Sequence, residues 1–468
     1  MLKKIQTVFL YSLIFILQFN ARYIFNFPEI KNLQSFHEQT TLSLFAFDLL
    51  FLLLAVVFIR YHSKRIVWGV FLKESLNSPL FYFVIYILLF IFWQKGNFYF
   101  TLRLLEAVIL FIVAKTLFKQ YTVAVYGKFI IFSAGVMQSV LAIIQVLTQK
   151  SIGLTFLGES IMSPSIYNVA KFEFAGEKYI RAYGTFPHPN LLAIFLLFAL
   201  ASGLGVLLLK EKTLASLKYR YRLIFYGELF LIISGIISTY SRIAIILMFV
   251  ILGMFIFQQR QKINQAYLLF CQHFKIPFFL QTTLAILIVF GSIFTTYNIL
   301  APRLCVECIN DNSLKLHQTY NSLAKNIIAK YPIFGVGPGN FVSIFKKNNV
   351  YHLNEWDIQP VHNFYLLAGS EIGLLGLLLL LLTVTFYFFR RTTIQTIISS
   401  PVKLFFLLCL LAGLFDHYFW TLPQGQLIFW LSLALATAPQ LETIDSPKYH
   451  FKIILKNTRQ LIKDLSQF

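Results

Sequence analysis

The chain has 468 residues, of which 58% are hydrophobic and only 13% are charged. Soluble domains carry about 25% charged residues, and one or two soluble cores cannot bury this much apolar surface. The composition therefore excludes soluble, disordered and fibrous proteins and indicates an all-α integral membrane protein. The formal charge of +21 does not indicate nucleic acid as a partner, because the basic residues lie in short clusters between apolar runs.

Apolar segments long enough to cross a lipid bilayer, about 20 residues each, recur along the chain. They predict about twelve transmembrane helices, at residues 5–22, 41–59, 79–94, 100–119, 123–148, 189–209, 222–239, 242–258, 276–297, 361–389, 402–420 and 424–438. With a cytoplasmic N-terminus, most of the 40 Lys and Arg residues fall on the inner side of this arrangement, as the positive-inside rule requires. We therefore expect both termini in the cytoplasm.

The predicted helices divide the chain into six parts. These are helices one to five at 1–148, a first extracytoplasmic loop at 149–188, helices six to nine at 189–297, a large extracytoplasmic loop at 298–360, helices ten to twelve at 361–438, and a basic cytoplasmic tail at 439–468. The apolar pattern of residues 314–330 predicts an amphipathic helix near the membrane interface. Because loops of this length are usually functional, we expect the functional site on the extracytoplasmic side.

Three predicted helices begin at the outer surface with polar segments. These segments are RAYGTFPHPN at 181–190, STYSR at 238–242 and PVHN at 360–363. The free N–H groups and the dipole at a helix N-terminus favour an anion. Arg181 and Arg242 add positive charge and a donor geometry suited to phosphate oxygens, and His362 can exchange a proton near neutral pH. The pattern predicts a diphosphate-binding site with a base beside it.

These segments resemble the O-antigen ligase/O-antigen polymerase family of bacterial envelope glycosyltransferases. The resemblance extends to YPIFGVGPGNF at 331–341, VHNFYLLAGSEIGLLG at 361–376 and DHYFWTLPQGQ at 416–426, and it covers about residues 180–430. It implies a GT-C-like protein of the bacterial plasma (inner) membrane in which His362, Arg181 and Arg242 are the catalytic residues. It also implies a glycan donor on undecaprenyl diphosphate, with no nucleotide sugar, no cofactor and no required metal ion.

The expected reaction moves this glycan to an acceptor hydroxyl on the outer face of the membrane. The two arginines would hold the diphosphate, and His362 would take the acceptor's proton in a single, inverting displacement. Ligase and polymerase differ in the acceptor, which is a lipid, a glycan or a protein, and both remain open. A transporter or flippase of lipid-linked glycans is the alternative from another class. It would carry polar residues through the membrane midplane and a repeat, whereas the polar clusters here lie at one face.

Four further residues are candidates for contact with the donor or the acceptor: His188, Asn190, Asn363 and Asp416. Asn190 and Asn363 also suit the start of a helix, which is the more ordinary role of asparagine there. Asp416 lies at the outer end of the predicted span 402–420, where it could orient His362 or bind a sugar hydroxyl.

The remaining polar motifs predict structural roles. Arg103 and Glu106 are three residues apart on one helix and are expected to pair. Glu371 lies about 180° around the helix from His362, and the Gly-rich segment 335–341 lacks the Lys-Ser/Thr ending of a P-loop, so a tight turn is expected there. Cys305 and Cys308 indicate a disulfide or two unpaired thiols, because a zinc site would need two more ligands.

Overall fold

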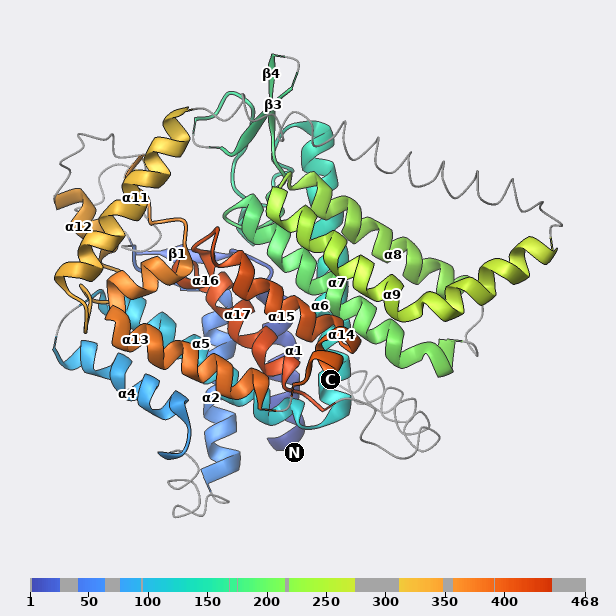
Figure 1. Ribbon diagram of the computed structural model, residues 1–468, viewed down its shortest axis with the longest axis horizontal. Coiled ribbons are helices and arrows are strands. Elements are labelled where there is room, and N and C mark those ends of the chain that lie inside the picture. The colour runs from blue at the N-terminus through green and yellow to red at the C-terminus, as the bar shows by residue number, and fades with distance from the viewer. Residues whose placement is uncertain are drawn as a thin grey trace.

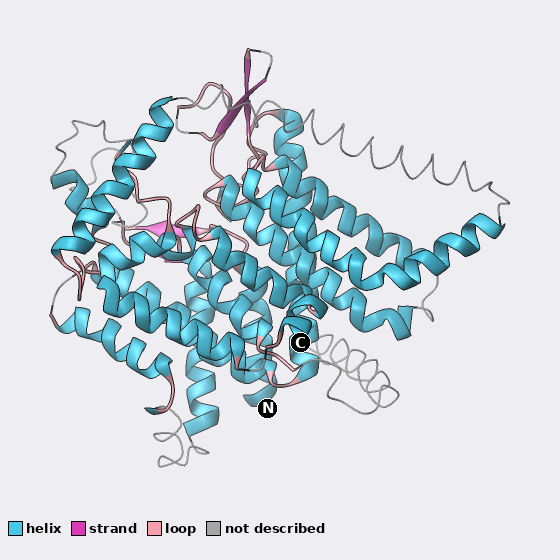
Figure 2. Cartoon of the chain, viewed as in Figure 1, coloured by secondary structure: helices cyan, strands magenta, loops and turns pink. Residues whose placement is uncertain are grey.

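The computed structural model describes ten segments of the chain. These are residues 2–25, 41–63, 76–93, 96–167, 169–174, 176–214, 219–273, 311–347, 357–390 and 392–439. Apart from two short pairs of antiparallel strands, the regular structure in these segments is helical (Figure 2). The predicted span 276–297 and the pair Cys305 and Cys308 lie outside the described residues.

The helices follow the predicted apolar segments in order (Figure 1). They are α1 (Leu2–Ile16), α2 (Ala46–Ser63), α4 (Pro79–Phe92), α5 (Phe98–Phe118), α6 (Tyr121–Thr148), α7 (Pro189–Leu214), α8 (Tyr219–Ser238), α9 (Arg242–His273), α11 (Asp311–Lys330), α12 (Phe341–Lys347), α13 (Phe364–Phe389), α14 (Ile394–Ser399), α15 (Pro401–Ala412), α16 (Tyr418–Thr421) and α17 (Pro423–Ala436). Strand β1 (Arg22–Ile24) pairs antiparallel with β2 (Ser43–Phe45), and β3 (Lys171–Phe174) pairs with β4 (Glu177–Ile180).

Among the described residues, five helices are long and apolar enough to cross a membrane. They are α2, α6, α13, residues 189–208 of α7 and residues 242–260 of α9. Helices α4, α15 and residues 224–238 of α8 are apolar but shorter. An all-α multi-pass membrane fold is thus confirmed, whereas the count of twelve helices and their orientation stay predictions.

Three predicted spans differ most from the helices observed. Helix α9 continues to His273 rather than ending at residue 258. Helix α1 ends at Ile16 rather than at residue 22, since strand β1 begins at Arg22. The predicted span 402–420 is not one helix, because α15 ends at Ala412 and residues 413–417 are non-helical before the short helix α16. The carbonyl of Gly413 instead accepts a hydrogen bond from the N–H of Phe364, 2.8 Å away. The Gly413 carbonyl therefore bonds to the start of α13 and not to a following turn of its own helix.

Helix α7 is the centre of the bundle, because 94% of the residues in its most apolar stretch, within 189–208, are buried. It packs against α6, α8, α9 and α15. Small residues allow these backbones to approach closely, as is usual between membrane helices: a Cβ added to Gly135 of α6 would lie 2.2 Å from that of Ala199. The start of α7, at Pro189, is therefore held by the surrounding helices.

The Gly-rich segment 335–341 is a tight turn packed on α13, as predicted. Glu371 of α13 is fully buried, and its carboxylate accepts hydrogen bonds from the N–H groups of Gly339 (2.8 Å) and Phe341 (3.2 Å) and from the indole of Trp420 (2.7 Å). The predicted structural role of Glu371 is confirmed. Gly373 kinks α13 at φ +70° so that the turn fits beside it.

Substitution of Gly373 by alanine is expected to destabilise the protein by about 2 kcal/mol or more. Its φ is left-handed, and an added Cβ would lie 2.0 Å from the carbonyl oxygen of Ile333. The matched control is Gly253→Ala in α9, where no described atom lies within 4 Å of the added Cβ. The melting temperature of the purified protein in detergent should fall clearly for the first variant only. Equal melting temperatures for both variants would contradict the kink.

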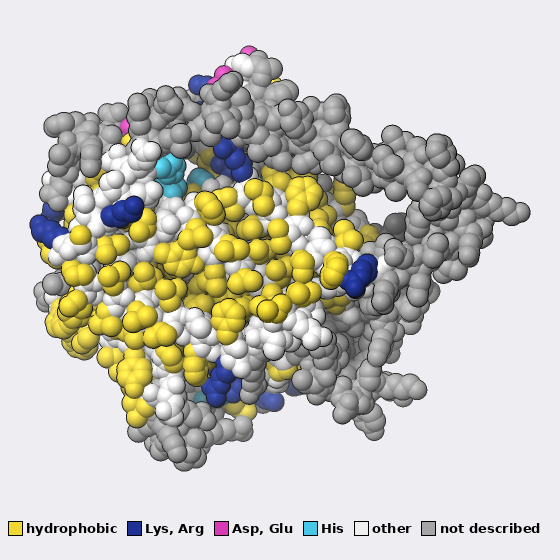
Figure 3. All heavy atoms as spheres, in the orientation of Figure 1, with side chains coloured by type: hydrophobic (Ala, Val, Ile, Leu, Met, Phe, Trp, Pro, Cys, Tyr) yellow, Lys and Arg dark blue, Asp and Glu magenta, His cyan; other side chains and the backbone are white. Residues whose placement is uncertain are grey.

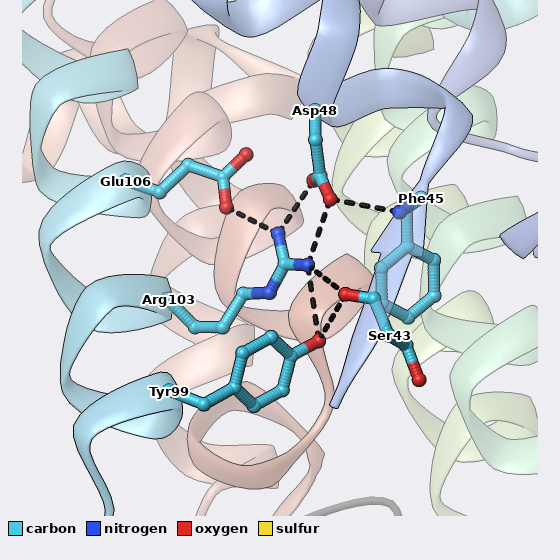
Figure 4. A network of polar contacts seen from close by, with 6 residues as sticks. All are labelled: Ser43, Phe45, Asp48, Tyr99, Arg103 and Glu106. Carbon is cyan, nitrogen blue, oxygen red and sulfur yellow. Dashed lines mark hydrogen bonds and ion pairs between the residues drawn. The ribbon is translucent and has the colours of Figure 1, made fainter. Parts of the chain in front are cut away.

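A buried polar network joins α2 to α5 (Figure 4). The predicted pair is present, with Arg103 Nη1 2.6 Å from Glu106 Oε2. The guanidinium also donates to both carboxylate oxygens of Asp48, at 2.5 and 2.7 Å, and to the carbonyl oxygen of Ser43 at 2.8 Å. Asp48 in turn accepts from the N–H of Phe45, so the network fixes strand β2 to the start of α2.

Candidate functional site

The three predicted polar segments meet one another and a fourth segment, the non-helical residues 413–417. The N–H of Ala182 donates to the carbonyl of Ser238 at 3.1 Å, which joins the start of α7 to the start of α9. The N–H of Phe364 donates to the carbonyls of Gly413 and Asp416, which joins the start of α13 to the fourth segment. Four chain segments that are far apart in the sequence thus surround one site.

Two glutamines of α6 hold the backbone that carries Arg181. Gln145 accepts from the N–H groups of Tyr183 (3.0 Å) and Gly184 (2.8 Å) and donates to the carbonyl of Gly184. Gln138 accepts from the N–H of Thr185 and donates to its hydroxyl. Because both glutamines are fully buried, the segment before α7 is a fixed element of the site and not an adjustable loop.

Arg181 is buried and joins two of the segments. Its Nε donates to the carbonyl of Thr239 at 2.7 Å, and its Nη2 donates to the side-chain oxygen of Asn190. The Asn190 amide donates to Asp416 Oδ2 at 3.1 Å. Arg181, Asn190 and Asp416 thus form one chain of polar contacts at the start of α7.

The Asp416 carboxyl lies between hydrogen-bond donors in a buried position. Besides the Asn190 amide, it accepts from the N–H of His417 at 2.8 Å. Burial raises the pKa of Asp416 to about 7, although these hydrogen bonds and the charge of Arg181 act in the opposite direction. Asp416 therefore changes its charge near neutral pH.

His362 lies just before α13 and contacts three aromatic rings. The centroid of its ring is 4.5 Å from that of His317, 5.0 Å from that of His417 and 6.0 Å from that of Tyr320. Burial and the neighbouring His317 lower the pKa of His362 to about 4. In the described part of the chain, no group hydrogen-bonds its buried Nδ1. The imidazole is therefore neutral at physiological pH and able to accept a proton.

His188 and Asn363 already have partners within the protein. His188 Nδ1 accepts from the N–H of Asn190 at 3.2 Å and lies 2.7 Å from the hydroxyl of Tyr418. The side chain of Asn363 caps α13 by accepting from the N–H groups of Tyr365 and Leu366, and it donates to a carbonyl at residue 414. Their predicted contact with substrate stays a prediction.

Arg242 differs from Arg181 in its surroundings. It is the first residue of α9, its side chain is exposed, and within the described segments its guanidinium has no hydrogen-bond or ion-pair partner. Its charge acts on Arg181, so the two arginines contribute positive charge to the same region. Between α7, α9, α15 and α16 lies a pocket; its lining is Asn190, Ile194, Ser241, Ile243, Ala244, Ala412, Asp416, Tyr418 and Phe419. The lining combines polar side chains with apolar ones.

The space-filling view shows one face of the protein (Figure 3). A continuous apolar band covers this face, with Lys and Arg side chains along its margins, as is typical of a surface that contacts lipid. Histidine side chains gather with basic ones at the upper margin of the band, where the surface is hollowed.

Three residues of the site were not predicted from the sequence: His317, His417 and Tyr418. His417 and Tyr418 are adjacent to Asp416, which was a signal that could have identified them. His317 lies on the predicted amphipathic helix, now observed as α11, but nothing in the sequence connects it with His362. The described residues contain no group of three His, Cys, Asp or Glu side chains arranged to hold a metal ion. The ring of His362 instead packs against the rings of His317 and His417.

A family model described as O-antigen ligase matches residues 229–381. The match includes Arg242, the Gly-rich turn and His362, whereas Arg181 and Asp416 lie outside it. No curated protein matches the sequence. The family is associated with glycosyltransferase-type activity in a membrane. The resemblance noted in the sequence is thereby confirmed over residues 229–381, where the chain is similar to the O-antigen ligase family.

Proposed function

We propose that the protein transfers a glycan from undecaprenyl diphosphate to an acceptor hydroxyl at the extracytoplasmic face of the bacterial plasma membrane. One observation carries the proposal: Arg181 and Arg242, at the starts of two adjacent helices, lie beside a pocket that also contains Asp416. Such an arrangement suits a diphosphate attached to an apolar chain. Ligase and polymerase share this donor site and differ in the acceptor.

The two arginines have different tasks in donor binding. Arg181 is held by Thr239 and Asn190, so it offers a fixed positive charge. Exposed Arg242 can turn its two-pronged donor group toward phosphate oxygens. The first units of the polyprenyl chain fit the apolar pocket wall formed by Ile194, Ile243 and Ala244. Both charges also stabilise the diphosphate as it leaves.

His362 is the proposed general base. Above about pH 4 its imidazole is neutral, so it can take the proton of the acceptor hydroxyl as that oxygen attacks the anomeric carbon. A negatively charged donor bound beside it favours the protonated form, which raises its pKa toward neutrality during the reaction. The attack and the departure of the diphosphate occur in one displacement, which inverts the anomeric centre.

The proposal is tested with purified protein, a polyprenyl-diphosphate glycan and a hydroxyl acceptor. We expect a new glycosidic bond of inverted configuration, and we expect its formation to survive EDTA because arginines handle the phosphate charge. A product that retains the configuration would overturn the single displacement. Loss of product with EDTA that Mg²⁺ or Mn²⁺ restores would overturn the assignment of the phosphate charge to Arg181 and Arg242.

Donor affinity is expected to fall as the pH rises through about 7. The pKa of Asp416 is raised from 3.8 to about 7, so this carboxyl is neutral below pH 7 and negative above it. The added charge next to Arg181 repels the anionic donor, which should weaken binding roughly three- to tenfold between pH 6 and pH 8. Binding of the donor without acceptor is the measurement. Asp416→Asn, which cannot ionise, should show no such decrease; an equal decrease in this variant would contradict the role of Asp416.

A further inference from the structure

A row of rings leads from His362 to the amphipathic helix α11. His317 projects from α11 (Asp311–Lys330) and contacts the ring of His362 edge to face, with centroids 4.5 Å apart and planes at 79°. His317 is half-buried, whereas His417, the next ring on the other side of His362, is only 8% exposed. The row therefore has one end toward water and one end in the protein interior.

The proposed reaction leaves a proton on His362 that has to be released after each transfer. Each transfer joins the acceptor oxygen to the anomeric carbon, breaks the bond from that carbon to the diphosphate oxygen, and leaves one proton on His362. The imidazole must lose this proton before the next acceptor can be activated. The Nδ1 of His362 is buried and has no hydrogen-bond partner among the described residues, so a proton taken up at this nitrogen needs a route to water.

We infer that His317 takes the proton from His362 and releases it to water on the extracytoplasmic side. The inference rests on the proposed function. No oxidant or further reactant is needed: the proton moves from the acceptor hydroxyl to His362, then to His317, then to water or buffer. Imidazoles in ring contact at this distance can pass a proton directly after a small rotation or through one bridging water.

The other neighbours of His362 do not fit this task. The Nδ1 of His417 lies 2.7 Å from the hydroxyl of Thr421, and the residue is buried. The hydroxyl of Tyr320 donates to the carbonyl of Asp357, and burial raises the pKa of Tyr320 to about 12. Neither group both titrates near neutral pH and reaches water.

The groups that face His317 keep it ready to accept a proton and to lose it again. Among the described side chains of its own helix, the titratable ring in contact with it is Tyr320, at 6.2 Å between ring centroids. From the other segments His362 faces it directly, His417 interacts with it electrostatically, and Asp357 lies at the Tyr320 hydroxyl. Burial lowers the pKa of His317, so a proton received there passes readily to water.

The test uses the full-length enzyme and two substitutions, His317→Gln and His317→Phe. Glutamine keeps the polarity, and phenylalanine keeps the ring contact, but neither can relay a proton by titration. In weakly buffered solution we expect kcat to fall about tenfold for both variants, with KM for the donor unchanged. Added imidazole, which can take the proton from His362 in place of His317, should restore kcat in a saturable way.

Tyr320→Phe is the matched control, because it removes one anchor of α11 beside His362 without removing a group that titrates near neutral pH. Any loss of kcat in this variant should be insensitive to added imidazole. Wild-type kcat in both His317 variants, or a reduced kcat that imidazole does not restore, would overturn the relay. The two proposals fail separately: absence of transfer by the wild-type enzyme contradicts the proposed function, whereas active wild-type enzyme with unaffected His317 variants contradicts the relay alone.

Discussion

Replacement of His362 by alanine is expected to lower the rate of glycan transfer by about 10²–10⁴ while donor affinity stays within a few-fold of wild type. The variant removes the proposed base but leaves Arg181, Arg242 and Asp416 in place. Single-turnover transfer at saturating donor measures the chemical step, and equilibrium binding of the donor without acceptor measures affinity. The two measurements separate a base from a donor-binding residue.

The control for this variant is Tyr365→Phe at the start of α13. It removes the hydrogen bond from the tyrosine hydroxyl to the carbonyl of Leu410, at 2.6 Å, and leaves the imidazole untouched. Transfer by this variant should remain close to wild type. If His362→Ala abolishes donor binding yet transfers normally once donor is saturating, His362 is a ligand of the donor and not the base.

The second large effect is expected at the two arginines. Arg242→Lys keeps the charge but loses the two-pronged donor geometry, so donor affinity should fall about tenfold while folding and some turnover survive. Arg181→Lys should be more damaging, because lysine cannot donate to both the Thr239 carbonyl and the Asn190 side chain from this buried position. From the sequence alone, Arg181 lies in a loop that could adjust, so a milder loss of donor affinity is expected for Arg181→Lys than for Arg242→Lys. The buried contacts of Arg181 lead us to expect the larger loss instead.

Donor binding and melting temperature together distinguish the two variants. Arg242→Lys should change affinity alone, and Arg181→Lys should lower both affinity and melting temperature. Arg260→Lys is the matched control, since Arg260 is an exposed arginine further along α9 that lies over the ring of Phe257. Equal donor affinity in Arg242→Lys and Arg260→Lys would remove Arg242 from the donor site.

Much of the fold follows from local patterns in the sequence. The ends of α5, α6, α7 and α13 lie within a few residues of the predicted spans, because apolar length and polar helix starts are local signals. The break at 413–417 was missed, because the hydrogen bonds that replace the helix come from Phe364, in a distant part of the chain. Helix geometry predicted a structural role for Glu371, but its hydrogen bonds to the Gly-rich turn are known only from the structure.

The site was only partly predictable for the same reason. Proline and asparagine at helix starts, together with arginine, identified Arg181, Asn190 and Arg242 as polar residues at one face. The contact of Asn190 with Asp416 joins residues 226 positions apart, and the contact of His317 with His362 depends on how α11 packs on α13. Such contacts depend on tertiary packing, which no local pattern encodes.

The central claim is tested most directly in proteoliposomes that carry the lipid-linked glycan in one leaflet, with an acceptor outside. One experiment measures both the new glycosidic bonds and the movement of intact donor between leaflets. Our account predicts bond formation when donor and acceptor share the extracytoplasmic side, no acceleration of donor movement, and loss of bond formation in His362→Ala. Donor movement without new glycosidic bonds would contradict the account and identify a transporter.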